Sequence, residues 1–187
     1  MGLTTVTTAY AVLAVVADAL VAAALVGFAV SRASSAGRDR WTAVRDAVTP
    51  FALPGAWLVA ALATFGSLYL SEIAGLIPCQ LCWFQRIAMY PLILVLGIAT
   101  LRGELDIARR YFLWLPLVGA CISIYHYQLE RFPSQPTLSC GLEAPCSVPV
   151  VDVWGFVSVP FMALAAFLLI ATLLLIGREE PNEIPIA

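Results

Sequence analysis

Five long apolar stretches constrain this chain of 187 residues more than any other feature. They occupy residues 9–30, 51–77, 81–101, 111–127 and 154–176. A helix needs about 20 apolar residues to cross the hydrocarbon core of a bilayer, and each stretch is close to or above that length. Only 12% of the residues are charged, whereas soluble domains carry about 25%. The sequence therefore predicts an all-α, polytopic membrane protein, and it excludes an ordinary soluble enzyme or a nucleic-acid-binding protein.

The arginines predict how the spans are oriented. Counting the loops alternately, eight arginines fall on one side of the membrane: Arg32, Arg38, Arg40, Arg45, Arg102, Arg109, Arg110 and Arg178. The other side holds only Arg131, with Arg86 just inside a span. Basic residues are enriched in cytoplasmic loops, so we expect a cytoplasmic C-terminus and an external N-terminus. The net charge of −2 gives no indication of a polyanionic partner.

Four of the five cysteines fall on the predicted outer side, where disulfides persist. Cys79 and Cys82 form a Cys-x-x-Cys turn before the third stretch, and Cys140 and Cys146 lie in the loop before the fifth. A disulfide that closes so short a loop can be exchangeable. Two such pairs on one face predict a relay that passes a disulfide from one pair to the other. Structural disulfides and a four-cysteine zinc site are the alternatives. Cys121, inside the fourth stretch, is expected to be a buried, inert thiol.

Arg86 is the most unusual charge in the chain. It follows Cys82 by four residues, so on a helix it lies on the same face, about one turn deeper. An arginine at the edge of a bilayer is costly and is therefore a candidate functional residue. It could hold an electron-rich oxygen, such as a quinone carbonyl, beside the Cys82 sulfur. The alternative is that its side chain extends to the lipid head groups. We expect no metal, because a zinc site would explain neither Arg86 nor the embedded helix.

The run Pro-Cys-Gln-Leu-Cys-Trp-Phe-Gln-Arg at residues 78–86 resembles the signature of the DsbB family of disulfide-bond formation proteins. The resemblance covers about residues 51–176 and includes Trp154-Gly155-Phe156 followed by Pro160-Phe161. It is strongest to the short-loop branch of Gram-positive bacteria, often named BdbC. Related vitamin K epoxide reductases carry the loop pair before the Cys-x-x-Cys, whereas here the Cys-x-x-Cys comes first.

This resemblance implies a bacterial inner-membrane enzyme that reoxidises a thioredoxin-fold, DsbA-like thiol oxidase. The electrons would pass to the membrane quinone pool, as ubiquinone or menaquinone. Cys79 and Cys82 would be the pair next to the quinone, with Arg86 as a quinone contact. His126, near the end of the fourth stretch, matches a family histidine near the quinone.

In the same resemblance, the loop pair meets the partner protein. Cys140 would be attacked by the partner's thiol, and Cys146 would exchange with Cys79. Two other functions remain open from the sequence. The same relay could run backwards as an outward-feeding thiol reductase, or the protein could be a non-catalytic membrane scaffold with structural disulfides.

Three segments follow from this comparison. Residues 1–50 would form an additional N-terminal transmembrane helix and a cytoplasmic Arg-rich loop. Residues 51–177 would form a DsbB-like four-helix membrane bundle, and residues 178–187 a cytoplasmic tail. The first segment carries no Cys or His and lies outside the resemblance. We therefore expect residues 1 to about 46 to be dispensable for the chemistry.

Overall fold

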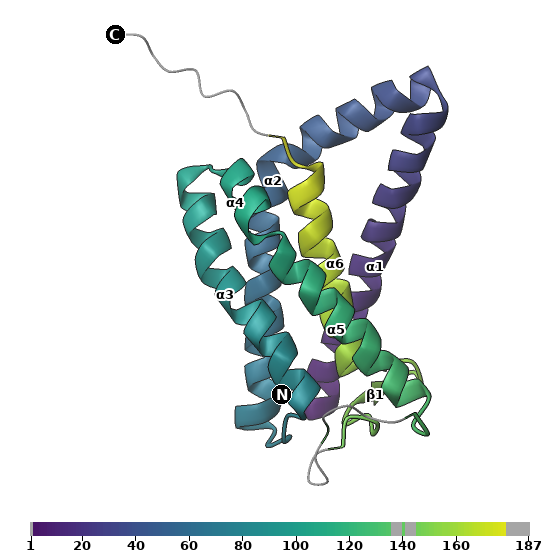
Figure 1. Cartoon of the computed structure of the whole chain (residues 1–187), viewed down its shortest axis with the longest axis vertical. Helices are drawn as coiled ribbons and strands as arrows, with labels where there is room; N and C mark the ends of the chain where they lie inside the picture. The colour runs from purple at the N-terminus through teal and green to yellow at the C-terminus, as the bar shows by residue number, and fades with distance from the viewer. Residues whose placement is uncertain (1, 136–139, 141–144, 179–187) are drawn as a thin grey trace.

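A computed structural model describes residues 2–135, 140 and 145–178. The described part is almost entirely helical (Figure 1). Its elements are α1 (Leu3–Ala33), α2 (Ser35–Leu68), the π-helical turn η1 (Tyr69–Ile73), α3 (Gln80–Arg102), α4 (Leu105–Phe112), α5 (Trp114–Arg131), β1 (Asp152–Val153), β2 (Val157–Ser158) and α6 (Val159–Ile176). The strands pair as a small antiparallel hairpin. The proposed tail, from residue 179 onward, lies outside the described residues.

Four of these helices are long and apolar enough to cross a membrane: α1, α2 with η1, α3 and α6. Helices α4 and α5 meet at a bend of 48° and together pass the same test, which gives a fifth span if they act as one. The predicted all-α, multi-pass membrane fold is confirmed.

The Arg-rich segment was expected to be a loop, and this expectation is wrong. The single residue Ser34 separates α1 from α2, and its side chain accepts a hydrogen bond from the backbone N–H of Gly37 at 3.0 Å. This N-cap starts a helix of 34 residues, about 51 Å long, which exceeds the ~30 Å hydrocarbon core. Pro50 and Pro54 lie within it. Figure 1 shows the first half of α2 crossing the top of the molecule before the helix turns down into the bundle.

The eight arginines of the predicted cytoplasmic side gather at one end of the molecule. The α1–α2 corner, α4 and the end of α6 lie at this end, and the hairpin lies at the opposite one (Figure 1). Three hydrogen bonds join α2 to the end of α6. Arg45 Nε donates to the carbonyl of Ile176 at 2.8 Å, the backbone N–H of Arg178 donates to Thr49 Oγ1 at 3.1 Å, and Arg178 Nη1 donates to Asp46 at 3.3 Å. The arginines that the sequence assigns to one side of the membrane therefore lie together at one end of the folded molecule.

The core of the bundle lies between α2, α3, α5 and α6, where Leu92, Leu96, Phe167 and Ile170 are fully buried. Gly119 lets α5 approach α6 closely, since a Cβ there would lie 2.3 Å from the ring of Phe167. Helix α1 packs outside this core. The packing leaves the cysteine-bearing start of α3 at the end opposite the arginines.

Candidate functional site

The turn that carries the first cysteine pair is built by the end of α2 and the start of α3. Helix α2 closes in the π-helical turn η1, a feature often found at functional sites. Cys79 is the N-cap of α3, and its sulfur accepts a hydrogen bond from the backbone N–H of Cys82 at 3.3 Å. The third apolar stretch starts at residue 81, and the helix begins one residue earlier, at Gln80. The Cys79 sulfur therefore accepts one of the free N–H groups at the start of the helix, that of Cys82.

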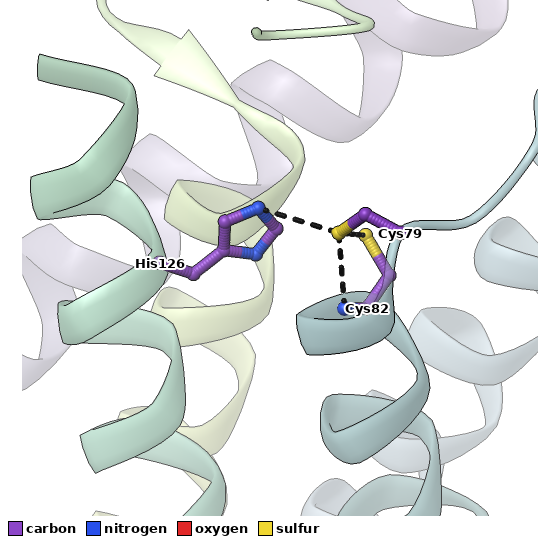
Figure 2. Close-up of side chains that lie close together, drawn as sticks. All are labelled: Cys79, Cys82 and His126. Carbon is purple, nitrogen blue, oxygen red and sulfur yellow. Dashed lines mark hydrogen bonds between the residues drawn. The ribbon is translucent and has the colours of Figure 1, made fainter. Parts of the chain in front are cut away.

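Cys79 lies between Cys82 and His126 (Figure 2). Its sulfur is 2.8 Å from the sulfur of Cys82 and 3.6 Å from Nε2 of His126, which projects from α5. The hydrogen bond from Cys82 is the largest cause that lowers the pKa of Cys79, and His126 lowers it further against the opposing effect of burial. These donors favour the thiolate, which is the nucleophilic form of cysteine.

The second pair, Cys140 and Cys146, forms a disulfide with a Cα–Cα distance of 5.8 Å. Cys146 is 1% exposed and packs in one apolar cluster with Cys79, Leu81 and Leu129. Cys140 is half-buried at the edge of the same cluster. The structure therefore brings all four predicted relay cysteines together, with the first pair as thiols and the second as a disulfide.

A large apolar cavity of about 350 Å³ lies beside Cys82 and Arg86. Arg86 is only 8% exposed, so it does not extend to the head groups. Its Nε donates to Oγ of Ser67 at 2.9 Å, and its Nη2 donates to the Ser67 carbonyl at 3.0 Å. A guanidinium has five N–H donors, so three have no protein acceptor among the described residues. Those donors remain available to a ligand.

A second cavity, of about 280 Å³, lies on the other side of the cysteine pair. Cys79, His126 and Glu130 line this cavity, and Cys82 lines both. His126 thus contacts a sulfur and is not among the residues that line the larger cavity. Within the described part of the chain, Nδ1 of His126 and one carboxyl oxygen of Glu130 are buried without a hydrogen-bond partner.

Comparison with known proteins shows which family has this arrangement. The family model "Disulfide bond formation protein DsbB" matches residues 50–177, which is more than half of the chain. The chain belongs to the DsbB family. It is accordingly a disulfide bond formation protein of an oxidoreductase family.

Two relatives of this DsbB-family protein show how far the sequence similarity extends along the chain. It is 44% identical over 132 residues to Disulfide bond formation protein C of Bacillus subtilis, covering 70% of this chain and 95% of the relative. It is also 44% identical over 129 residues to Probable disulfide formation protein C of Halalkalibacterium halodurans, covering 67% and 93%. No solved structure matches. The family match begins at residue 50, so α1 and the first part of α2 lie outside it.

Several residues that support the DsbB-like site were not found from the sequence. The sequence gives no indication of the role of Ser67, because nothing in it pairs this residue with Arg86. Gln85 donates to Ser123 at 3.0 Å and ties α3 to α5 beside the larger cavity. Glu130 could have been found, since it follows His126 by one helical turn. Cys121 was expected to be buried, but it is exposed on α5 and would face lipid.

The structure groups three potential metal ligands at the first cysteine pair. Cys140 and Cys146 are bonded to each other, so the four-cysteine zinc alternative is not formed. The ligand atoms of Cys79, Cys82 and His126 lie within 4.8 Å of one another, a set that could hold a thiophilic ion when both sulfurs are reduced. A redox assay of this protein therefore needs a chelator control.

We expect His126→Phe to raise the pKa of Cys79, because it removes the ring nitrogen beside the thiolate. One hydrogen bond contributes about 0.5–1.5 kcal/mol. At pH values below the Cys79 pKa of both proteins, the thiolate fraction of the variant should therefore be about two- to ten-fold lower than that of the unmodified protein. The difference should vanish at high pH, where both proteins are fully ionised. Thiolate ultraviolet absorbance of the reduced protein, titrated against pH, measures it.

The matched control for this titration is His126→Gln, which keeps a side-chain donor and should give an intermediate profile. Cys79→Ala identifies the part of the signal that belongs to Cys79. Superimposable titrations of His126→Phe and the unmodified protein would show that His126 does not stabilise the thiolate.

Proposed function

We propose that this protein is a thiol:quinone oxidoreductase that reoxidises a thioredoxin-fold, DsbA-like partner and delivers the electrons to a membrane quinone, ubiquinone or menaquinone. One observation carries the proposal. Cys82 and Arg86 line the same apolar cavity, and the other three relay cysteines pack in one cluster with Cys82. This arrangement joins an exchange site for protein thiols to a site for an apolar electron acceptor.

The larger cavity suits a quinone on chemical grounds. Its volume of about 350 Å³ falls in the usual range for ligand sites. Its walls are mostly apolar, as an isoprenoid quinone requires, and Arg86 supplies a charged donor for a carbonyl oxygen. A bound quinone would accept the two electrons and two protons that are released when two thiols form a disulfide.

The exchange steps follow from the two pairs. A partner thiolate attacks Cys140, and Cys146 leaves as a thiolate. The partner's second thiolate attacks the mixed disulfide, which forms the partner's disulfide and releases Cys140 as a thiolate. Cys146 then attacks Cys79 in an oxidised Cys79–Cys82 pair and Cys82 leaves as a thiolate, after which Cys140 attacks Cys146 and releases Cys79 as a thiolate. The net result is a loop disulfide and two thiols at Cys79 and Cys82. The structure has this same distribution, with Cys140 bonded to Cys146 and the first pair unbonded.

Burial supports the order of attack in this scheme. Cys140 is the more exposed sulfur of its pair, as a residue attacked by another protein must be. Cys146 is enclosed and shares its cluster with Cys79, as an internal exchange partner should. The hydrogen bonds to Cys79 would hold it as a thiolate after exchange, ready for reoxidation.

We expect single Cys→Ala changes at Cys79, Cys82, Cys140 or Cys146 to abolish quinone reduction by the purified protein with a reduced thioredoxin-fold partner. Each removes one sulfur of the relay. Cys121→Ala is the matched control, because Cys121 lies on α5 outside the cluster, and it should retain full turnover. Loss of turnover in Cys121→Ala, or its survival in Cys82→Ala, would contradict the scheme. A scaffold would reduce no quinone at all, and a reductase would oxidise quinol in preference.

Arg86→Met should lower kcat/KM for a soluble quinone, because it removes the donor that faces the cavity. A charge-assisted hydrogen bond contributes about 1.5–3 kcal/mol, which corresponds to roughly ten- to a hundred-fold. Arg86→Lys keeps the charge without the planar fork and should retain partial function. Steady-state kinetics measures both, with disulfide exchange between the two pairs as the control that survives. Unchanged kinetics in Arg86→Met would place the quinone elsewhere.

We further propose that the cysteine end faces outward from a bacterial cell membrane and the arginine end faces the cytoplasm. A membrane-impermeant thiol reagent, applied to intact cells after mild reduction, should label Cys140 or Cys146. In a variant without the native cysteines, Ser35→Cys at the α1–α2 corner should be labelled only after lysis. The reverse pattern would invert the orientation and remove the oxidase function with it.

A further inference from the structure

Helix α1 lies outside the DsbB family match, yet it forms one side of the larger cavity. The match begins at residue 50. The residues of α1 that line the cavity include Thr7, Tyr10, Leu13, Ala14 and Ala17. The remaining sides come from α2, α3 and α6, together with the turn before Cys79 and the segment before the hairpin. Figure 1 shows α1 running from the cysteine end, where it meets the bundle, to the α1–α2 corner at the arginine end.

Tyr10 fastens α1 next to the residue that holds Arg86. Its hydroxyl donates to the carbonyl of Leu62 on α2 at 3.1 Å. Its ring lies on Gly66, where an added Cβ would be 2.6 Å from the ring carbons. The next residue, Ser67, accepts both hydrogen bonds from Arg86. Tyr10 therefore connects α1 to the polar corner of the cavity.

A second contact holds α1 against α6. Ala14 and Ala17 form a small apolar cluster with Ala165, and Phe161, Met162 and Leu169 pack around it. Small side chains let two helices approach closely in a membrane, where dispersion and not the hydrophobic effect drives packing. With α1 attached to α2 by Tyr10 and to α6 by these alanines, the space between becomes a walled cavity.

We propose that α1 is the lipid-side wall of the quinone site, and that Tyr10 is the positioning residue that holds this wall in place. The inference rests on the proposed function and deepens it, since it assigns recognition of the quinone ring and tail partly to a helix outside the family match. Without α1, the cavity would open sideways to lipid acyl chains, which would compete with an apolar quinone. The proposal gives α1 a role in quinone binding, whereas the sequence alone led us to expect residues 1 to about 46 to be dispensable for the chemistry.

Helix α1 is placed to affect quinone binding and not thiol–disulfide exchange. Residues of α1 line the cavity, but within the described part of the chain no hydrogen bond joins α1 to the sulfur of Cys79 or Cys82. An interaction that contributes equally to the bound substrate and to the transition state changes KM and leaves kcat unaltered. Changes in α1 should therefore raise the KM for quinone while thiol exchange with the partner continues at its normal rate.

The experiment compares three variants of the full-length protein, assayed with a short-chain benzoquinone analogue and a naphthoquinone analogue of the same tail. Tyr10→Ala removes the ring that sits on Gly66 and should raise the KM for both quinones about five-fold, with kcat changed less than about two-fold. Tyr10→Phe keeps the ring and loses only the hydroxyl, so its KM should stay close to that of the unmodified protein. Thr7→Leu places a larger side chain in the wall of the cavity. It should therefore raise the KM for the wider naphthoquinone more than the KM for the benzoquinone.

Val12→Ala is the matched control, because Val12 is on α1, is 47% exposed and is not among the cavity residues. It should leave both constants unchanged. An unaltered KM in Tyr10→Ala and Thr7→Leu would overturn the assignment of α1, whereas failure of the unmodified protein to reduce any quinone would overturn the proposed function itself. If Tyr10→Ala does not fold, the naphthoquinone-to-benzoquinone KM ratio of Thr7→Leu decides alone. An unchanged ratio and an unchanged KM there would overturn the proposal.

Discussion

A guanidinium enclosed by apolar helices must find acceptors inside the protein, because neither lipid nor water can supply them there. In this protein Ser67 provides two, its hydroxyl and its carbonyl. The bonds join α2 to α3 just before α2 loosens into its π-helical turn. They also aim Arg86 along the wall of the larger cavity, one turn below Cys82. The distance between the charge and the sulfur is thus set by two helices at once, and neither can shift without exposing a buried charge.

Around this joint the molecule separates two environments. Cys82 lines both cavities, and Cys79 lines only the smaller one, with His126 and Glu130. The larger side is apolar and carries one cation, whereas the smaller side carries a carboxyl group and a ring nitrogen without partners in the described structure. The two cavities beside the cysteine pair therefore differ in the polarity of their walls. The Cys140–Cys146 disulfide packs in one apolar cluster with this pair.

Sequence reasoning found the parts of the site whose partners are close along the chain. The Cys-x-x-Cys pair and Arg86 share one helix, so their spacing alone placed them together. Hydropathy located the spans, because the bilayer imposes a length on each. It failed for the Arg-rich segment, since charge excludes that segment from the membrane but does not prevent a helix. The roles of Ser67 and Tyr10 could not be predicted from the sequence, because they depend on contacts between helices. His126 was linked to the quinone through the family likeness, whereas the structure places it against a sulfur.

The course of α1 also determines where foreign sequence can be attached. This helix starts at Leu3 beside the cysteine end, and α6 ends at Ile176 at the opposite end (Figure 1). An affinity tag or fluorescent protein fused ahead of α1 would emerge at the cysteine end of the molecule. The same fusion after α6 would hang from the arginine-rich end, remote from every sulfur of the relay. Reporter and purification handles for this protein therefore belong at its C-terminus.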